Sequence, residues 1–232
     1  MDAQNFIDIL KTHQSDAERE KIERYFDATV SDSKIIGVRM KRIFDLAKNN
    51  KDLDIAEINT LLDSPYYEAR MGAVSVMDFQ ARRKSNEEHR KALFELYLDR
   101  HARINNWDLV DRAAKRVIGG YLYEFEKPRD ILYQLANSKN QWERRTSIVS
   151  TSYFIREGEL DETFRVAELL LDDEQELMHK AVGSWLRHAG KTDQERLLVF
   201  LDTHAPQMPP TMLRVATQKL DNNQREQYRK QY

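Results

Sequence analysis

The feature that most constrains the fold is a set of similar helix starts that recurs along the chain. Each is a short run that precedes a predicted helix with a basic residue: Leu61-Leu62-Asp63-Ser64 before Arg70, Leu135-Ala136-Asn137-Ser138 before Arg145, Leu170-Leu171-Asp172-Asp173 before Lys180, and Met208-Pro209-Pro210 before Arg214. The steps are 75, 35 and 34 residues, and a missing member inside the first step falls near Trp107. A period of 34 to 37 residues that holds two helices predicts an α-solenoid of HEAT or TPR type.

The rest of the sequence agrees with an all-α fold. Glycine and proline together number only 7 and 5 of 232 residues, fewer than sheet proteins need for their turns. Capping boxes that begin at Ser15, Ser85 and Thr192 predict three helix starts, and the pair Pro209-Pro210 predicts another. We therefore expect about a dozen helices, arranged as about six HEAT-like pairs in one domain over residues 1–232, with a curved body and a concave face.

Charge and composition exclude several classes of site. The chain has 37 lysines and arginines against 39 aspartates and glutamates, so its net charge is −2. It has no cysteine, which removes disulfides, thiolate nucleophiles and zinc–thiolate centres. The histidines lack metal-ligand spacing, and Gly190-Lys191-Thr192 lacks the earlier glycine of a phosphate-binding loop. We expect no metal and no cofactor. Without an apolar run long enough for a membrane span or a signal peptide at the start, we expect a cytoplasmic monomer with no membrane association.

The small net charge is the sum of a basic segment and an acidic segment. Residues 100–145 carry ten basic and six acidic side chains, whereas residues 156–177 carry two basic and nine acidic side chains. A basic centre on a concave face could attract a polyanion. The acidic run is typical of a solvated helix face.

Two tryptophans stand one repeat apart, each with a charged residue on its own helix face. Trp107 is followed four residues later by Asp111, and Trp142 is followed three residues later by Arg145. The first interpretation is a functional surface, on which Trp107, Asp111 and Arg145 open onto one basic cleft. The second is a structural one, in which Trp107 is a core residue and Arg145 braces neighbouring repeats.

The structural interpretation has its own support. Trp107 continues an apolar stripe through Val110, Ala114, Val117 and Tyr121, as a core residue does. The aspartates of this helix can form ion pairs one turn along it, Asp111 with Lys115 and Asp108 with Arg112. The third tryptophan, Trp185, extends Met178 and Val182 at helical spacing, and we expect it in the core.

Together these segments resemble the DNA alkylation-repair glycosylase family (AlkD-like) from about Tyr25 to Leu220. The segments that carry the resemblance are Arg103-Ile104-Asn105-Asn106-Trp107-Asp108-Leu109-Val110-Asp111, Trp142-Glu143-Arg144-Arg145, His179-Lys180-Ala181-Val182-Gly183 and Met208-Pro209-Pro210-Thr211-Met212-Leu213-Arg214. The resemblance implies a HEAT-like solenoid that binds double-stranded DNA. It also implies hydrolytic release of cationic purines alkylated at N3 or N7, without the base flipping that most glycosylases use.

The resemblance also assigns residues. It implies that Asp111 and Trp107 are catalytic, with Asp111 stabilising positive charge on the sugar and positioning a water, and the face of Trp107 favouring a cation. It implies that Arg145 contacts a backbone phosphate and that Tyr25 is also a DNA-binding residue. We expect further phosphate contacts from four basic residues: Arg144, Lys180, Arg187 and Arg39.

One position departs from the family pattern. Where family members have a tryptophan directly after the glycine of the third segment, this chain has Ser184, and its own Trp185 comes one residue later. On a helix that shift turns the ring by about 100°. Two alternatives therefore stay open beside the glycosylase: a relative that binds DNA without excising a base, and a non-enzymatic protein-interaction solenoid.

Overall fold

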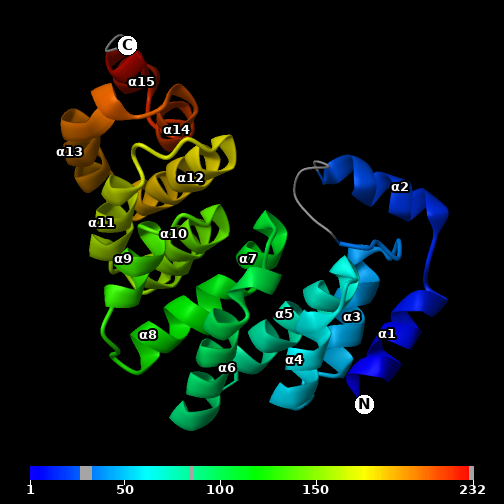
Figure 1. Cartoon of the computed structure of the whole chain (residues 1–232). Helices are drawn as coiled ribbons and strands as arrows, with labels where there is room; N and C mark the ends of the chain where they lie inside the picture. The colour runs from blue at the N-terminus through cyan, green and yellow to red at the C-terminus, as the bar shows by residue number, and fades with distance from the viewer. Residues whose placement is uncertain (27–32, 84–85, 230–232) are drawn as a thin grey trace. The chain divides into compact units, whose positions relative to one another are not determined.

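The computed structural model describes residues 1–26, 33–83 and 86–229, and these residues form a succession of helices (Figure 1). The α-helices are α1 (Ala3–Thr12), α2 (Asp16–Tyr25), α3 (Met40–Asn49), α4 (Ile55–Asp63), α5 (Tyr67–Ala81), α6 (Glu87–Asp99), α7 (Trp107–Ala114), α8 (Tyr121–Glu124), α9 (Asp130–Ala136), α10 (Gln141–Arg156), α11 (Asp161–Leu169), α12 (Glu176–Thr192), α13 (Gln194–His204), α14 (Pro210–Ala216) and α15 (Asn222–Arg229). Single turns of 3₁₀-helix occur at η1 (His101–Arg103) and η3 (Ala205–Gln207), and η2 (Lys115–Gly120) is a π-helical continuation of α7. Within these described ranges there is no β-strand, so the all-α prediction is confirmed.

The chain divides into two compact units, Met1–Tyr121 and Leu122–Tyr232. In the N-terminal unit, α5 is the central helix and packs against α3, α4 and α7. Nearly every residue of α5 is buried, as expected of a helix that has neighbours on all sides. The helices α1 and α4 pack together, as do α4 and α6, so that they form a row alongside α3, α5 and α7.

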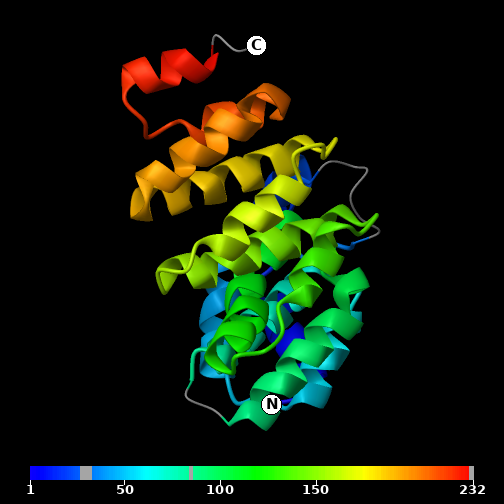
Figure 2. The same cartoon turned by 90° about the vertical axis from the view of Figure 1, so that its left-hand side faces the viewer.

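The C-terminal unit repeats one packing arrangement. Figure 1 shows α9, α11 and α13 along one side of this unit and α10, α12 and α14 along the other. α10 packs on α12 and α12 packs on α14, and Figure 2 shows the helices stacked in succession up to the red α15. Such stacking buries a continuous apolar core between neighbouring pairs, and that is how an α-solenoid is stabilised.

The predicted repeat period is present in the helix positions. The second helices of successive pairs, α5, α7, α10, α12 and α14, begin at residues 67, 107, 141, 176 and 210. Successive starts are therefore 40, 34, 35 and 34 residues apart. The missing repeat was expected near Trp107, and α7 begins at that residue. The longer first step contains η1, a turn between α6 and α7.

Several helix starts differ from the predicted capping boxes by one residue. The N-cap of α13 is Asp193, whose carboxylate accepts a hydrogen bond from the backbone N–H of Arg196 at 3.0 Å, whereas Thr192 ends the preceding helix. The N-cap of α6 is Asn86, and Ser85 lies outside the described residues. Aspartate and asparagine are as good N-cap residues as serine and threonine are. The prediction that a helix begins here was therefore correct, but the capping residue was placed one position too early. Pro210 begins α14 as predicted.

A glycine sets the spacing between α12 and α14. A Cβ atom on Gly183 would lie 2.5 Å from the backbone oxygen of Met212 and 2.9 Å from the Cβ of Val215. Both are parts of α14 that cannot rotate away, so the two helices approach closely only because residue 183 lacks a side chain.

We expect Gly183→Ala to lower the free energy of unfolding by about 1 to 3 kcal/mol, because the added methyl group forces α12 and α14 apart. Gly190→Ala is the matched control on the same helix, where the added Cβ meets the side chain of Leu197 rather than backbone. Urea denaturation of both variants measures the difference. Equal losses at the two positions would contradict a backbone contact at Gly183.

No helix in the described ranges is both long enough and apolar enough to cross a membrane.

Candidate functional site

The first two turns of α7 present the two residues expected to be catalytic. The side chain of Asn106 accepts a hydrogen bond from the backbone N–H of Trp107 at 2.7 Å and so fixes where the helix begins. The apolar stripe is buried at Val110, Ala114 and Val117, which orients the helix. Trp107 itself is half-buried and Asp111, one turn later, is exposed. The stripe is therefore core, as the structural interpretation predicted, but its first residue lies at the edge of that core.

Trp107 and Asp111 line the same pocket of about 480 Å³ within the N-terminal unit. The complete lining comes from α2, α3, α5, α7 and the segments next to them: Glu18, Lys21, Ile22, Phe26, Val38, Met40, Phe44, Tyr67, Met71, Trp107, Asp108, Asp111 and Arg112. This lining holds three carboxylates and two cations, so the pocket is not the basic cleft that the sequence analysis anticipated.

Asp108 lies beside the two expected residues and is held from α5. Its Oδ2 accepts a hydrogen bond from the hydroxyl of Tyr67, which is itself only 2% exposed. The suggested ion pair between Asp108 and Arg112 is not the arrangement found, because the Arg112 guanidinium contacts Asp78 of α5 at 2.8 Å. Asp108 and Arg112 therefore each contact a residue of α5, Tyr67 and Asp78, instead of each other.

Burial is the main reason that the pKa of Asp108 rises to about 6, and the nearby Asp111 carboxylate raises it further, whereas the Tyr67 hydrogen bond lowers it. The same environment raises the pKa of Tyr67, first through burial and then through the Asp108 charge. Above pH 6 the pocket therefore contains a partly buried carboxylate whose charge is costly to the fold. Carboxyl groups with perturbed pKa values are concentrated at functional sites.

We expect Asp108→Asn to stabilise the protein at pH 8. A carboxyl whose pKa is higher in the folded state than in the unfolded state costs stability as it ionises, so the cost is absent near pH 4, grows up to about pH 6 and is complete above that. A shift of two units corresponds to about 3 kcal/mol. The new amide donors offset part of this gain, which leaves about 1 to 2 kcal/mol.

Urea denaturation of native and Asp108→Asn protein at pH 8 and pH 4.5 measures this effect. The variant should gain stability relative to the native protein at pH 8 and lose most of that advantage at pH 4.5. A native protein that is the more stable of the two at pH 8 would show that the charge stabilises the fold, contrary to the expectation.

Arg112 belongs to a cluster around the buried Asp78. The Asp78 carboxylate lies 2.6 Å from Arg82, 2.8 Å from Arg112 and 3.7 Å from Arg116. The Arg112 guanidinium also lies over the ring of Phe44, 4.6 Å from its centroid. Arg112 is thus fixed by a carboxylate outside the pocket while its stem forms part of the pocket wall.

A second buried carboxylate, Glu68, holds the segment that contributes Val38 to the pocket lining. The Glu68 side chain of α5 is fully buried and accepts hydrogen bonds from the backbone N–H groups of Ile36, Gly37 and Val38, at 3.0, 2.7 and 3.3 Å. Gly37 adopts φ of +93°, a conformation that favours glycine. The segment before α3 is therefore fastened to α5, and this places Val38 in the pocket wall.

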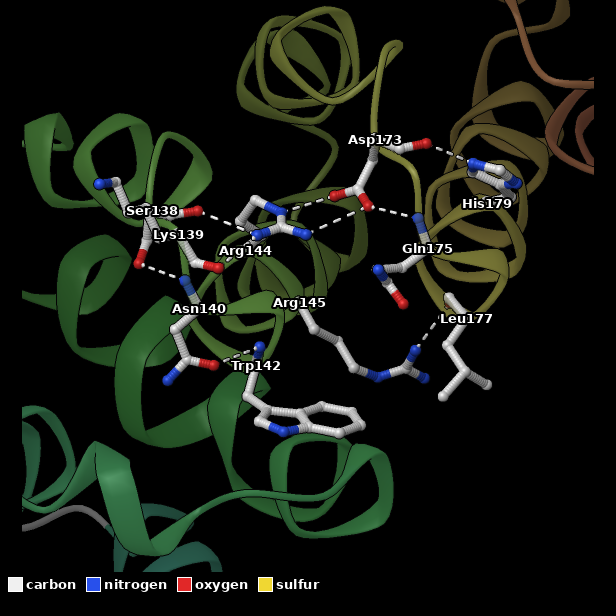
Figure 3. A network of polar contacts seen from close by, with 10 residues as sticks. All are labelled: Ser138, Lys139, Asn140, Trp142, Arg144, Arg145, Asp173, Gln175, Leu177 and His179. Carbon is white, nitrogen blue, oxygen red and sulfur yellow. Dashed lines mark hydrogen bonds and ion pairs between the residues drawn. The ribbon is translucent and has the colours of Figure 1, made fainter. Parts of the chain in front are cut away.

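In the C-terminal unit, Arg144 is occupied by contacts within the fold (Figure 3). Its Nε and Nη2 donate to the two oxygens of Asp173 at 2.6 and 3.2 Å, and its Nη1 donates to the carbonyls of Ser138 and Lys139. The side chains of Arg144 and Asp173 are 17% and 1% exposed. This arrangement joins the α9–α10 turn to the α11–α12 turn and favours a structural role over the expected phosphate contact.

Arg145 is also engaged by the next repeat. It is 8% exposed, and its Nη1 donates to the carbonyl of Leu177 in the first turn of α12 at 3.1 Å. Figure 3 shows its side chain extended past Trp142 toward α12. One of the two interpretations of Arg145 was that it braces neighbouring repeats, and its hydrogen bond to Leu177 agrees with that interpretation. Arg145 lies in the unit that does not contain the pocket.

Of the other expected DNA contacts, Lys180 and Arg39 are exposed and Arg187 is half-buried. Lys180 pairs with Glu176 at 3.5 Å and Arg187 donates to the side chain of Gln218. Arg39 pairs with Glu18 at 3.0 Å. Tyr25 is the last residue of α2, and its side chain lies outside the described part of the structure.

The prediction that Trp185 is a core residue is wrong. Met178 and Val182 are buried, but Trp185 is half-buried, and its ring lies 5.0 Å from the ring of His188. Ser184 is half-buried next to it, and its carbonyl oxygen lies 2.7 Å from the Nδ1 of His188. The apolar stripe of α12 is narrower than its sequence spacing indicated.

The sequence did not indicate the pocket residues outside α7, above all Tyr67 and Phe44, and on α7 it indicated an ion pair for Asp108 rather than a place in the pocket. The signal that could have found Tyr67 was the helix start at Asp63-Ser64-Pro65, which places it in the first turn of α5. No group of histidine and carboxylate side chains suited to a metal ion occurs among the described residues.

The fold and pocket define a class: an all-α repeat protein with a tryptophan and carboxylates at the first turn of one repeat helix. The sequence matches the family model for DNA alkylation repair enzymes over residues 7–220, and the chain belongs to that family. A role in alkylation repair follows, and DNA is the substrate that the family indicates.

A solved structure described as a predicted DNA alkylation repair enzyme from Enterococcus faecalis has the same fold, with a TM-score of 0.72 and 16% sequence identity. The likeness covers 90% of this chain and 98% of that one. No curated protein matches the sequence.

Proposed function

We propose that this protein is a DNA glycosylase that hydrolyses the N-glycosidic bond of cationic N3- or N7-alkylated purines in duplex DNA. The observation that carries the proposal is the shared position of Trp107 and Asp111, which lie on one face of α7 and line one pocket. Family membership supports the substrate, because it indicates repair of alkylated DNA.

The residues suit the chemistry of a cationic leaving group. An alkylated purine already carries a positive charge, so the bond between C1′ and the base nitrogen breaks with both electrons passing to the base, and no acid is needed to protonate it. Positive charge then develops on the sugar, where the Asp111 carboxylate stabilises it. A water adds its oxygen to C1′ and loses a proton to the solvent by way of Asp111.

Trp107 and Asn106 complete the arrangement. The face of an indole ring favours a nearby cation by about 0.5 to 2 kcal/mol. Asn106 is 4% exposed and fixes the first turn, so Trp107 and Asp111 keep their relative position before substrate arrives. Preorganised charge of this kind needs no rearrangement during the reaction. Phosphate contacts from Lys180, Arg187 and Arg39 bind the duplex independently of its sequence, whereas the buried Arg145 is engaged by the carbonyl of Leu177.

The direct test is release of methylated purines from duplex DNA treated with a methylating agent, measured by mass spectrometry of the released bases. We expect release well above the spontaneous rate from methylated DNA and none from untreated DNA. Release at the spontaneous rate with protein in excess would overturn the proposal.

A second candidate is a DNA-binding protein that does not excise bases, and Ser184 favours it, because the family tryptophan is absent there and Trp185 lies against His188 instead. Duplex binding that weakens steeply with salt, without base release, would establish this second function. Absence of duplex binding at low salt would exclude both.

A further inference from the structure

A second cavity lies between α14 and α15, the last two helices of the C-terminal unit (Figure 1). Its volume of about 740 Å³ falls within the range of about 300 to 1,000 Å³ that is typical of small-molecule sites. α14 contributes Pro210, Leu213 and Arg214 to its lining. Every lining residue belongs to the unit Leu122–Tyr232, so this cavity is separate from the pocket at α7.

α15 turns a polar face toward the cavity. The residues of α15 that line it stand three and four positions apart, on one side of the helix: Asn222, Arg225, Glu226 and Arg229. The buried residue of this helix is Tyr228, which is 2% exposed and whose hydroxyl donates to Oδ1 of Asp202 on α13 at 2.8 Å. α15 is therefore anchored on α13, and its cavity face carries charge where a packed helix carries apolar side chains.

Two arginines of the lining are unpaired. Among residues 1–26, 33–83 and 86–229, the side chains of Arg214 and Arg225 make no hydrogen bond or ion pair, and both are exposed. Arg229 lies 3.9 Å from Glu226, but both side chains are largely exposed, so this ion pair is weak. With three arginines and one glutamate, the lining has two net positive charges.

The repeat explains why Arg214 lacks a partner. Arg145 and Arg214 are each the fifth residue of their helix, α10 and α14. Arg145 donates to the carbonyl of Leu177 in the first turn of the next repeat helix, α12. The helix that follows α14 is α15, which is anchored on α13. Arg214 therefore lines a cavity where Arg145 meets a carbonyl.

The charge and the shape of the lining suit a phosphate monoester. Guanidinium groups bind phosphate oxygens through paired N–H donors. A phosphate monoester carries a charge of about −1.5 to −2 at pH 7, which matches the net charge of the lining, whereas a phosphodiester within DNA carries about −1. Pro210 and Leu213 form an apolar wall on the α14 side, and a nucleobase can stack on a guanidinium plane.

We propose that the cavity between α14 and α15 binds a phosphate monoester of mononucleotide size, with Arg214 and Arg225 as donors to the phosphate and Leu213 as the wall against the rest of the ligand. The inference goes beyond the proposed glycosylase function and does not depend on it. Two sources offer this chemistry, a free mononucleotide and a phosphorylated DNA strand end, and the second experiment distinguishes them.

The first experiment measures binding to the full chain by calorimetry at pH 7.5, with deoxyadenosine 5′-monophosphate and with deoxyadenosine. We expect the nucleotide to bind at least tenfold more tightly. Arg214→Gln/Arg225→Gln should remove most of this preference without changing the melting temperature, because both side chains are exposed and unpaired. Arg196→Gln, at an exposed arginine of α13 outside the lining, is the matched control and should bind as the native protein does.

The second experiment compares an undamaged DNA hairpin that has a 5′-terminal phosphate with the same hairpin that lacks it. Tighter binding of the phosphorylated hairpin, lost in the double variant, supports the site and identifies the strand end as a source. Equal binding of the hairpins together with a preference for the nucleotide supports the site and identifies the free nucleotide.

Two results would overturn the proposal. One is equal affinity of native protein for nucleotide and nucleoside, with a double variant that binds both hairpins more weakly, since the arginines would then contact phosphodiesters within DNA. The other is a nucleotide preference that the double variant retains. Neither experiment contains a methylated purine, so failure of the glycosylase proposal leaves these results unchanged.

Discussion

Asp111→Asn should lose about 100- to 1,000-fold in the rate of methylated purine release while the fold and duplex affinity persist. Asparagine keeps the size of the side chain and one acceptor oxygen but removes its charge, and the charge is what stabilises the positive sugar. Removing one preorganised group of this kind from a transition state costs about 2.7 to 4 kcal/mol. Asp111 is exposed, so the free energy of unfolding should stay within about 0.5 kcal/mol.

Single-turnover release from methylated duplex, with enzyme in excess, isolates this effect from product release. The control is Asp99→Asn, a carboxylate at the end of α6 that takes no part in the pocket lining and should leave the rate unchanged. A rate for Asp111→Asn within threefold of the native rate would remove Asp111 from the chemistry.

Arg144→Ala should lower the free energy of unfolding by about 3 to 5 kcal/mol. The substitution leaves the Asp173 carboxylate, 1% exposed, without its charged partner, and an uncompensated buried charge is costly. It also removes the two contacts to the carbonyls of Ser138 and Lys139 in the turn between α9 and α10. Asp173 keeps one hydrogen-bond donor, the backbone N–H of Gln175 at 2.9 Å, but no charged partner.

Urea denaturation provides the measurement, and Arg196→Ala is the matched control. The Arg196 side chain pairs with Asp161 at 2.5 Å, but both partners are largely exposed, so we expect a loss below about 1 kcal/mol. A comparison of duplex binding at several salt concentrations separates the two roles of Arg144. A structural brace leaves the salt dependence unchanged, whereas a phosphate contact reduces its slope by about 1.

The repeat could be predicted from the sequence because it depends on local signals. Helix starts, apolar spacing and turn residues recur every 34 or 35 residues in the later repeats, and the positions of α10, α12 and α14 followed from them. The capping residues of α6 and α13 were misplaced by one position, since several neighbouring side chains can each cap and only the backbone conformation selects among them.

The site could be predicted only in part, because its remaining residues depend on tertiary contacts. Trp107 and Asp111 share a helix face, which spacing alone reveals. Asp108 instead takes a partner 41 residues away, and Arg144 takes one 29 residues away. Sequence spacing indicated Arg112 as the partner of Asp108, and the resemblance led us to expect a DNA phosphate as the partner of Arg144. In the structure each side chain instead makes a buried contact with a residue distant in the sequence. Trp185 was mispredicted for a different reason. It continues the apolar pattern of Met178 and Val182, but the buried core of α12 ends before it, so Trp185 is only half-buried.

The order in which the pocket is built follows from its lining. Its residues run from Glu18 to Arg112, and all belong to the unit that ends at Tyr121. A ribosome therefore synthesises every wall of the pocket before it reaches the first residue of the C-terminal unit. During synthesis the groups that would handle the damaged base are complete while the helices that carry Arg145, Lys180 and Arg187 do not yet exist. Substitutions in those later helices can therefore alter the affinity for DNA without changing any pocket side chain.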